Sequence, residues 1–357
     1  MRKGIALVIA TALLCALAVP AVAAGYKDEY KMDVVPGPAT AWGMGAQYFA
    51  DLVKEKSGGK INIKVYFGSQ LSAGKQTSAF LLLRNGAIDF ALQSVINWSP
   101  QVKELNLTAM PFFIASRPDR FKAVDAIKAG KSGKMLIDAI EKKGVKFLGW
   151  GENGFRELTN SKRPVTSPAD LQGLKIRVVG SPIYIDIYNA LGANPINMNW
   201  AEATTAFQQG VVDGQENPIS IFFPLKIYEY HKFVTDWHYV IDPLLLCVNP
   251  DVWKSFPEQD RKMLQECVDL ASKYQIAIAR VGLDGDISLK YLQSIGKVPE
   301  ITNPYAALEK AGMTVTKLTP EQIKAFAEKT KPVAEKWRKE LGEELIKAAE
   351  EDMASVK

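Results

Sequence analysis

Apolar and polar positions along the first half of the chain predict strands and helices in turn. Short apolar or alternating runs indicate strands, and apolar residues at helical spacing indicate helices that end at glycines. Strands separated by helices pair in parallel and are covered on both faces. The predicted strands are residues 30–35, 60–67, 87–94 and 145–151, and the predicted helices are 39–59, 77–86 and 112–144.

The second half repeats this order, with strands predicted at 174–180 and 211–218 and helices at 182–192 and 200–210. Two segments of the chain are also similar to each other: "LLRNGAIDFALQS" and "AFQQGVVDGQENP" both predict the end of a helix, followed by a glycine, two apolar residues and an aspartate. Gly86 thus corresponds to Gly210, and Asp89 to Asp213. Two α/β lobes of similar build would explain the similarity, although a helix, a glycine and a strand also follow one another by chance.

The last third is predicted to complete these two lobes. Residues 232–248 form a long strand region that could cross back between them, and 257–296 keep helical spacing for longer than an average helix. Residues 318–352 predict amphipathic helices whose alternating charges are typical of a solvated face.

The fold class expected is therefore α/β, with two lobes that each hold a mostly parallel sheet flanked by helices, joined by crossing strands and a long helix. The boundaries expected are 24–153 for the first lobe, 154–240 for the second and 241–282 for a return to the first. Residues 283–357 would supply a long helix, completion of the second lobe and the C-terminal helices.

The N-terminus has the pattern of an export signal. Arg2 and Lys3 precede an apolar run that ends at Ala21-x-Ala23, so residues 1–23 are predicted to be a signal peptide and the mature chain to be periplasmic. A retained membrane anchor is the less favoured interpretation, because the run is short. Two cysteines remain, Cys247 and Cys267, and two buried free thiols are favoured over a disulfide.

Charge and motifs argue against several functions. The formal net charge of +5 becomes 5 − 2 = +3 without Arg2 and Lys3, which is too dispersed for a nucleic-acid partner. The two histidines, His231 and His238, lack a third ligand at metal-binding spacing and are interpreted as surface or interface residues. No nucleophile and base are paired in a known motif, so we expect no enzyme, no catalytic residue, no metal and no cofactor.

Polar residues gather where two of the predicted strands end. Arg177 lies near the carboxyl end of one strand, the edge at which open α/β sheets bind ligands, and its guanidinium matches a carboxylate. Asn217 is the next-to-last residue of "GVVDGQENP" and can both donate and accept hydrogen bonds. Trp200 could close over an apolar ligand body, and Arg156 offers a second cation after a glycine-containing turn. A structural ion pair is the alternative for Arg177.

These motifs resemble a known family. The segments "GFRELTNSKRPVTSPADLQGLKIRV" and "ALGANPINMNWAEATTAFQQGVVDGQENP" are similar to the DctP-type periplasmic solute-binding proteins of tripartite ATP-independent periplasmic (TRAP) transporters. The segments "GGKINIKVYFGSQL", "RNGAIDFALQS" and "MPFF" extend the resemblance to the first lobe. It implies that Arg177 clamps the ligand carboxylate, that Asn217 belongs to the polar signature, and that Arg156 is a second, more variable arginine.

The resemblance also implies a function and partners. The chain would capture an organic acid, close around it as a monomer, and deliver it to membrane permease subunits. Aromatic residues near the expected cleft would favour an acid with a flat or apolar body, and a small dicarboxylate would need Arg156 as its second cation. The ligand-binding residues expected, besides Arg177, Asn217 and Arg156, are Trp200, Trp42, Gln93, Trp98 and Phe222.

Two departures from the family pattern concern this site. Thr204 stands where a tyrosine is frequent, and the segment from Gln70 to Gly86 lacks the usual Leu-Gly and is a little longer. The second departure concerns the first-lobe contacts with the ligand. A sensor for a receptor, a binding protein of an ATP-driven importer, and a periplasmic enzyme that acts on an organic acid remain as alternatives.

Overall fold

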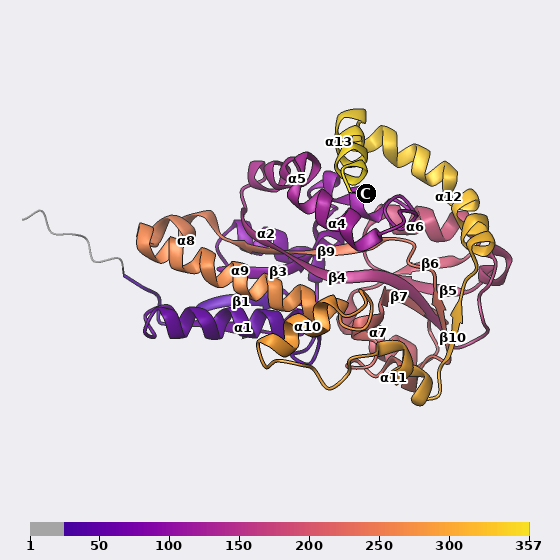
Figure 1. Cartoon of the computed structure of the whole chain (residues 1–357), viewed down its shortest axis with the longest axis horizontal. Helices are drawn as coiled ribbons and strands as arrows, with labels where there is room; N and C mark the ends of the chain where they lie inside the picture. Colours follow the sequence, from indigo (N-terminus) through magenta and orange to yellow (C-terminus); the bar gives the residue numbers. More distant parts are fainter. Residues whose placement is uncertain (1–24, 357) are drawn as a thin grey trace, which may run out of the picture.

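The computed structural model describes residues 25–356, so the predicted signal peptide lies outside the described residues. Two α/β lobes lie side by side along the long axis of the molecule, joined by strands that run between them (Figure 1). This confirms the fold class expected from the sequence. Among the helices of residues 25–356, none is both long and apolar enough to cross a membrane.

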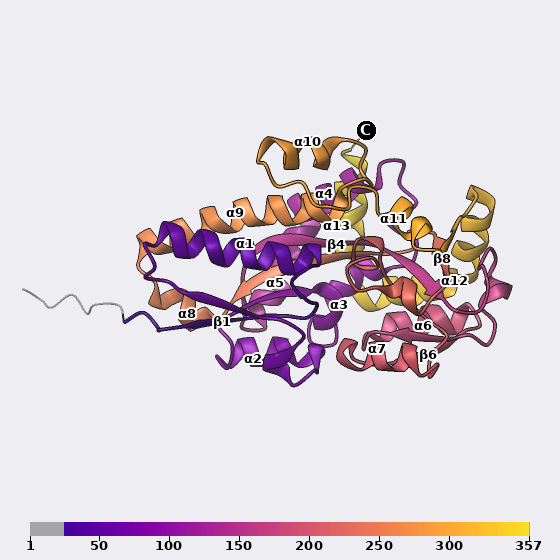
Figure 2. The ribbon, with the colours of Figure 1, turned by 90° about the horizontal axis from the view of Figure 1, so that it is seen from below.

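The first lobe is built on three parallel strands in the order β2-β1-β3, with α1 and α9 side by side over one face (Figure 2). Alternate residues of β1, Met32 and Val34, are fully buried in the same apolar cluster as Phe49 of α1. The elements are β1 (Tyr30–Val34), β2 (Ile63–Tyr66), β3 (Phe90–Ser94), α1 (Ala41–Lys56), α2 (Ala79–Arg84), α3 (Val95–Trp98), α8 (Pro250–Ser255) and α9 (Glu258–Arg280).

The second lobe is built on the parallel strands β7-β5-β6, and β8 and β10 form a further parallel pair. The helix α6 begins with Pro182 in its first turn, where the missing backbone N–H has no intrahelical partner to lose. The elements are β5 (Lys175–Val178), β6 (Asn194–Asn197), β7 (Gly214–Pro218), β8 (Phe233–Asp236), β10 (Thr314–Lys317), α6 (Pro182–Ala190), α7 (Trp200–Gln208), α11 (Pro304–Lys310) and α12 (Pro320–Leu341).

Two strands join the lobes. β4 (Lys146–Asn160) pairs with β9 (Ile241–Val248) through its first half and with β7 and β8 through its second half, always antiparallel. The turn expected just before Arg156 is therefore wrong, because residues 146–160 form one strand whose irregularities lie at Phe147/Gly149 and Glu152/Gly154. The predicted strand region 232–248 does return between lobes, but β8 and β9 are separate strands.

The C-terminal part packs on both lobes. The helical pattern expected over 257–296 is interrupted, because Gly282 and Gly285 adopt positive φ angles of 75° and 68° between α9 and α10 (Ile287–Ser294). α12 lies along α6, while α13 (Glu343–Ala354) packs on α4 (Arg120–Ala129) and α5 (Lys131–Lys142) (Figure 1).

The two similar segments around Gly86 and Gly210 have the same local structure. Gly86 and Gly210 both have positive φ, 76° and 65°, and each ends a helix. The carboxylate of Asp89 accepts a hydrogen bond from the backbone N–H of Lys31 at 2.8 Å, and that of Asp213 accepts one from Lys175 at 2.9 Å. In both lobes the aspartate thus ties the connection after a helix to a neighbouring strand.

The cysteines follow the favoured prediction. Cys247 in β9 and Cys267 in α9 are both free thiols and are fully buried. Burial raises the pKa of Cys267 to about 11, so this thiol is neutral at physiological pH.

The packing of α9 on β4 gives a test of the fold. A Cβ atom at Gly149 would lie 2.5 Å from Cγ1 of Val268 and 3.0 Å from Oγ of Ser272. Gly149→Ala should therefore lower the free energy of unfolding by about 1–3 kcal/mol, as overpacking does, measured by urea denaturation. Gly37→Ala is the control, because a Cβ there would meet nothing within 4 Å. Equal stability of the two variants would contradict this close contact.

Candidate functional site

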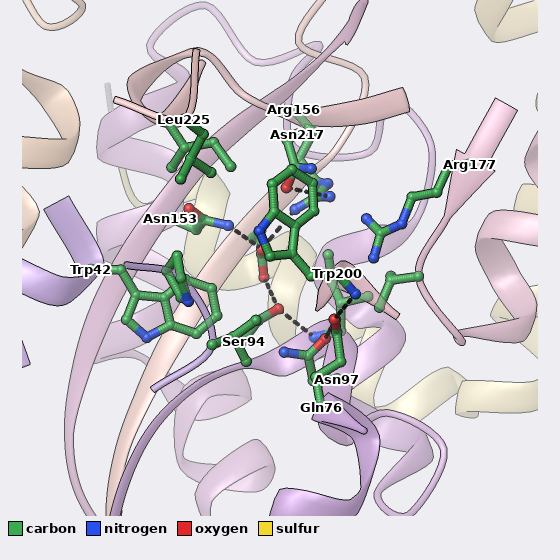
Figure 3. A pocket seen from close by; sticks show the side chains of 16 residues that line it. Trp42, Gln76, Ser94, Asn97, Asn153, Arg156, Arg177, Trp200, Asn217 and Leu225 are labelled. Atoms are coloured by element: carbon green, nitrogen blue, oxygen red, sulfur yellow. Dashed lines mark hydrogen bonds and ion pairs between the residues drawn. The ribbon is translucent and has the colours of Figure 1, made fainter. Parts of the chain in front are cut away.

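A cavity that opens to solvent lies between the lobes, at the carboxyl ends of the second-lobe strands. The space not filled by atoms in the cavity and its mouth is about 400 Å³, and Figure 3 shows side chains from both lobes pointing into it. Half of its lining is apolar and half is polar or charged. The lining residues are Val35, Pro36, Trp42, Gln76, Ser94, Ile96, Asn97, Asn153, Arg156, Arg177, Val179, Trp200, Asn217, Ile221, Leu225 and Asp242.

Asn217 of the segment "GVVDGQENP" lies in one wall of the cavity. The strand predicted over 211–218 begins three residues later than expected, because β7 runs from Gly214 to Pro218 and consists of the polar end of that segment. β7 lies between β4 and β5, which satisfy its backbone, and Gln215 donates to Thr159 Oγ1 at 2.8 Å. Because β5 and β7 are parallel, the ends that carry Arg177 and Asn217 reach the same edge, as predicted.

Arg156 is fully engaged by protein groups. Its guanidinium donates to both carboxylate oxygens of Glu216, to Asp242 Oδ2 at 2.9 Å and to Asn217 Oδ1 at 3.0 Å. Burial alone would lower the pKa of Arg156, but the Glu216 carboxylate outweighs it and raises that pKa well above its usual value. Arg156 therefore serves first to neutralise two buried acids, and it holds the Asn217 amide in place.

Arg177 is in the opposite situation. It is 2% exposed, and its Nε donates to the backbone oxygen of Met198 at 3.0 Å. Its Nη2 is buried and has no hydrogen-bond partner among residues 25–356. Burial lowers the pKa of Arg177 to about 10, so the group stays charged at neutral pH. A buried cation without its full set of acceptors is costly, and a ligand anion in the cavity would supply the missing acceptor.

Trp200 covers this guanidinium. The Arg177 guanidinium carbon lies 5.3 Å from the centre of the Trp200 ring, which is within range of a cation–π contact. In Figure 3 the Arg177 side chain extends from β5 toward Trp200, and Trp42 lies on the opposite side of the cavity. Trp42 donates from Nε1 to the backbone oxygen of Leu92 at 2.7 Å, which fixes its ring in the first-lobe wall.

The remaining expected site residues lie away from the cavity lining. Trp98 is fully buried against Phe80, with ring centres 5.2 Å apart, and Phe222 is fully buried in the apolar cluster of the second lobe. Gln93 does not line the cavity either, but lies behind it and bonds to Asn97. Position near a strand or helix end suggested these residues, whereas the direction of each side chain decides which of them reaches the cavity.

The polar floor of the cavity, formed by Asp242, Ser94 and Asn153, was not predicted from the sequence. Asp242 accepts from Ser94 Oγ at 2.5 Å, from Asn153 Nδ2 at 2.8 Å and from Arg156. Burial raises the pKa of Asp242 above its ordinary value, and the Arg156 charge opposes that rise. One signal was present in the sequence: Asp242 is an acid inside the apolar run "YVIDPLLLCV", where an unpaired carboxylate would be costly.

His231 is buried, which corrects the expectation of a surface residue, and the His238 side chain is partly exposed, at 20%. His231 is 1% exposed and bonds to Thr159 Oγ1 at 2.8 Å, and burial lowers its pKa to about 4. His238 lies with Glu157 and Asp236 in a group that has the composition of a metal site. Burial lowers the pKa of His238, but the two carboxylates outweigh it and raise that pKa to about 9. Each nitrogen of the His238 ring contacts a carboxylate oxygen, Nδ1 that of Glu157 and Nε2 that of Asp236, so the three side chains form an ion-pair group in this structure.

Two lobes that enclose a cavity with an incompletely paired cation define a ligand-binding protein for anions. A family model described as bacterial extracellular solute-binding protein, family 7 (DctP), matches residues 33–287, and the chain belongs to this family. The C4-dicarboxylate-binding periplasmic protein DctP of Rhodobacter capsulatus is 32% identical over 345 residues, which cover 96% of both chains.

Two further comparisons agree. The 2,3-diketo-L-gulonate-binding periplasmic protein YiaO of Escherichia coli K12 is 34% identical over 230 residues, 64% of this chain and 68% of that protein. The crystal structure of a TRAP periplasmic solute-binding protein from Ralstonia eutropha H16, with bound (S)-2-acetolactate, has a TM-score of 0.85 and 47% identity. It covers 92% of this chain and 100% of its own. The resemblance to DctP-type TRAP solute-binding proteins is thereby confirmed, and the chain is a substrate-capturing subunit of that class.

Because Arg156 is buried and paired with Glu216, loss of that carboxylate should strongly lower the free energy of unfolding. Glu216→Gln removes the carboxylate that contacts this buried guanidinium through two oxygens, so we expect a loss of about 3 kcal/mol of unfolding free energy. The control is Glu229→Gln, because Glu229 is 46% exposed and its pair with Lys226 is long, at 3.7 Å. Chemical denaturation measures both variants. A Glu216→Gln protein as stable as the wild type would show that Arg156 does not depend on this pair.

Proposed function

We propose that this TRAP solute-binding subunit captures a short monocarboxylic acid that carries an oxygen at C2 and a small branched body. The single observation that carries the proposal is the contrast between the two arginines of the cavity. Each guanidinium nitrogen of Arg156 has a protein acceptor, whereas Arg177 keeps a buried nitrogen without one among the described residues. We therefore assign the carboxylate to Arg177, with Asn217 and the polar floor beside it.

The charge balance of the cavity favours one carboxylate over two. Arg156 and Arg177 supply two positive charges, while Asp242 and the adjacent Glu216 supply two negative charges. One ligand carboxylate would pair with Arg177, but a second would face Asp242 with Arg156 already engaged. Desolvating a second, unpaired carboxylate is costly, so small dicarboxylates should bind less well.

The rest of the lining supports an acid with both polar and apolar parts. The side chains of Gln76, Asn97 and Asn153 can bond to a hydroxyl or keto oxygen, while Trp42 and Trp200 can pack on methyl groups. The Ralstonia protein, which shares 47% identity, was crystallised with (S)-2-acetolactate, a branched acid of this kind. A larger aromatic acid is the second candidate, but Trp98 and Phe222, which were expected to favour it, lie outside the cavity lining.

The proposed action is capture and release without chemistry. The lobes close over the acid, and the closed form presents it to membrane permease subunits, which belong to TRAP systems as a class. We further propose that the protein acts as a monomer in the periplasm, exported by the predicted signal peptide. The sensor, ATP-driven importer and enzyme alternatives gain no support from a particular residue of the cavity.

A thermal-shift panel tests the ligand class. The protein without residues 1–23 is unfolded and refolded to remove any bound acid, and is then mixed with 2-acetolactate, lactate, succinate, a sugar acid and benzoate. A ligand of the native state raises the midpoint through RT ln(1 + [L]/Kd), and we expect the largest shift with 2-acetolactate. A larger shift with succinate would contradict the monocarboxylate proposal, and no shift with any acid would contradict carboxylate capture itself.

Removing the proposed clamp should weaken binding and leave the fold intact. Arg177→Ala should lower the affinity for 2-acetolactate at least 10-fold, about 1.4 kcal/mol, by isothermal titration calorimetry. The thermal midpoint of the ligand-free variant should not fall, because the variant removes an incompletely paired buried charge. Arg84→Ala, an exposed arginine of α2, is the control. Unchanged affinity in a folded Arg177→Ala protein would contradict the assigned role.

A further inference from the structure

We propose that a row of buried amide side chains latches the second lobe to the first in the closed protein. The row, called here the amide relay, consists of Asp33, Gln93, Asn97 and Gln76 of the first lobe and the backbone N–H of Trp200 in the second. This inference rests on the proposed function. Gln93 and Asp33 are positioning residues, because they stabilise the closed form without lining the ligand cavity.

Each link of the relay is a direct hydrogen bond. The Trp200 backbone N–H donates to Gln76 Oε1 at 2.7 Å, and Gln76 Nε2 donates to Asn97 Oδ1 at 2.6 Å. Asn97 Nδ2 donates to Gln93 Oε1 at 3.2 Å, and Gln93 Nε2 donates to Asp33 Oδ2 at 2.7 Å. All four side chains are buried, with exposed fractions between 0% and 4%. Figure 3 shows Gln76 and Asn97 joined below Trp200.

The direction of the relay is fixed from both ends. A backbone N–H can only donate, so Gln76 must present its oxygen to Trp200 and its NH₂ to Asn97. Asn97 must then accept through its oxygen and donate its NH₂ to Gln93, and Gln93 is oriented in the same way. The last donor meets Asp33, which accepts. Burial raises the pKa of Asp33 to about 7, and a carboxyl oxygen can accept this bond whether or not the group is ionised. No amide of the relay can flip without breaking a bond at one of its neighbours.

The relay ends at a helix start that needs an acceptor. α7 begins at Trp200, and its N-cap residue Asn199 makes no capping hydrogen bond through its side chain. The first N–H groups of a helix lack intrahelical partners and are usually capped by a local side chain. Here Gln76 supplies that acceptor from the other lobe, so α7 gains this cap only when the cleft is closed.

The loop that carries Gln76 has a strained backbone. Ser69 and Ala73 have φ angles of 56° and 51°, a region that costs non-glycine residues energy, and Gly74 follows at 79°. A Cβ atom on Gly74 would lie 3.2 Å from Cβ of Ala201, so the loop fits closely against the start of α7. Apart from Ser69, this loop lies within residues 70–86, where the sequence analysis expected a departure from the family pattern.

Since the latch exists only in the closed form, breaking it should speed ligand release more than it slows capture. Gln93→Leu cuts the relay behind the cavity, and we expect the dissociation rate of 2-acetolactate to rise at least 10-fold with the association rate changed less than 3-fold. Stopped-flow tryptophan fluorescence measures both rates. Gln47→Leu makes the same change at an exposed amide of α1 and should alter neither rate.

A second variant separates the effect of the relay on ligand release from its effect on folding stability. Gln93→Leu leaves two buried groups without their partners, the Asp33 carboxyl and Asn97 Nδ2, whereas Asp33→Leu/Gln93→Leu leaves only Asn97 Nδ2 and should recover part of the lost thermal midpoint. The fast dissociation should persist in the double variant. A folded double variant that releases 2-acetolactate at the wild-type rate would show that the relay is only structural.

The latch consists of protein atoms alone, so it is also testable without ligand. Spin labels at Lys60→Cys and Gln209→Cys, one exposed site in each lobe, report the distance between the lobes. We expect the ligand-free wild type to populate a short, closed distance that Gln93→Leu loses. Equal closed populations, or none in the wild type, would overturn the latch. If the wild type binds none of the acids, the proposed function fails, but this distance measurement still decides the latch.

Discussion

The site depends on one unfavourable feature, a buried guanidinium that the protein leaves incompletely paired. Arg177 is held in place by the Met198 carbonyl and covered by Trp200, but neither group is an anion. The nearby carboxylates of Glu216 and Asp242 are directed instead to Arg156. In the proposed function, an acid that pairs with Arg177 would regain the free energy lost by burying this group, which would couple closure to occupancy.

The crossing strand makes this arrangement possible. Because β4 pairs with β9 in the first lobe and with β7 and β8 in the second, Arg156 lies where both lobes meet and can reach Glu216 and Asp242 together. That ion-pair group forms a fixed floor. Trp200 and the loop of Gln76 close over this floor. They belong to different lobes and are joined by a hydrogen bond that can form and break as the lobes move.

The sequence was sufficient for the order of elements and for the edge at which the site lies. Alternation of strands and helices indicates parallel pairing, and parallel pairing brings Arg177 and Asn217 to one edge. The sequence was insufficient where strand pairing sets the bounds of a strand, or where the direction of a side chain sets whether it reaches the cavity. The polar strand β7 was placed three residues early, because its polar side chains are buried by neighbours distant in sequence. Trp98 and Phe222 likewise point into apolar clusters, and Gln76 and Asn97 contact the site through long-range hydrogen bonds.

The most direct test of this account is a crystal structure of the refolded protein with 2-acetolactate. We expect the ligand carboxylate to pair with Arg177, including its Nη2, while Arg156 keeps its bonds to Glu216 and Asp242. A carboxylate bound to an Arg156 that has left Glu216, with Arg177 still unengaged, would contradict the central claim.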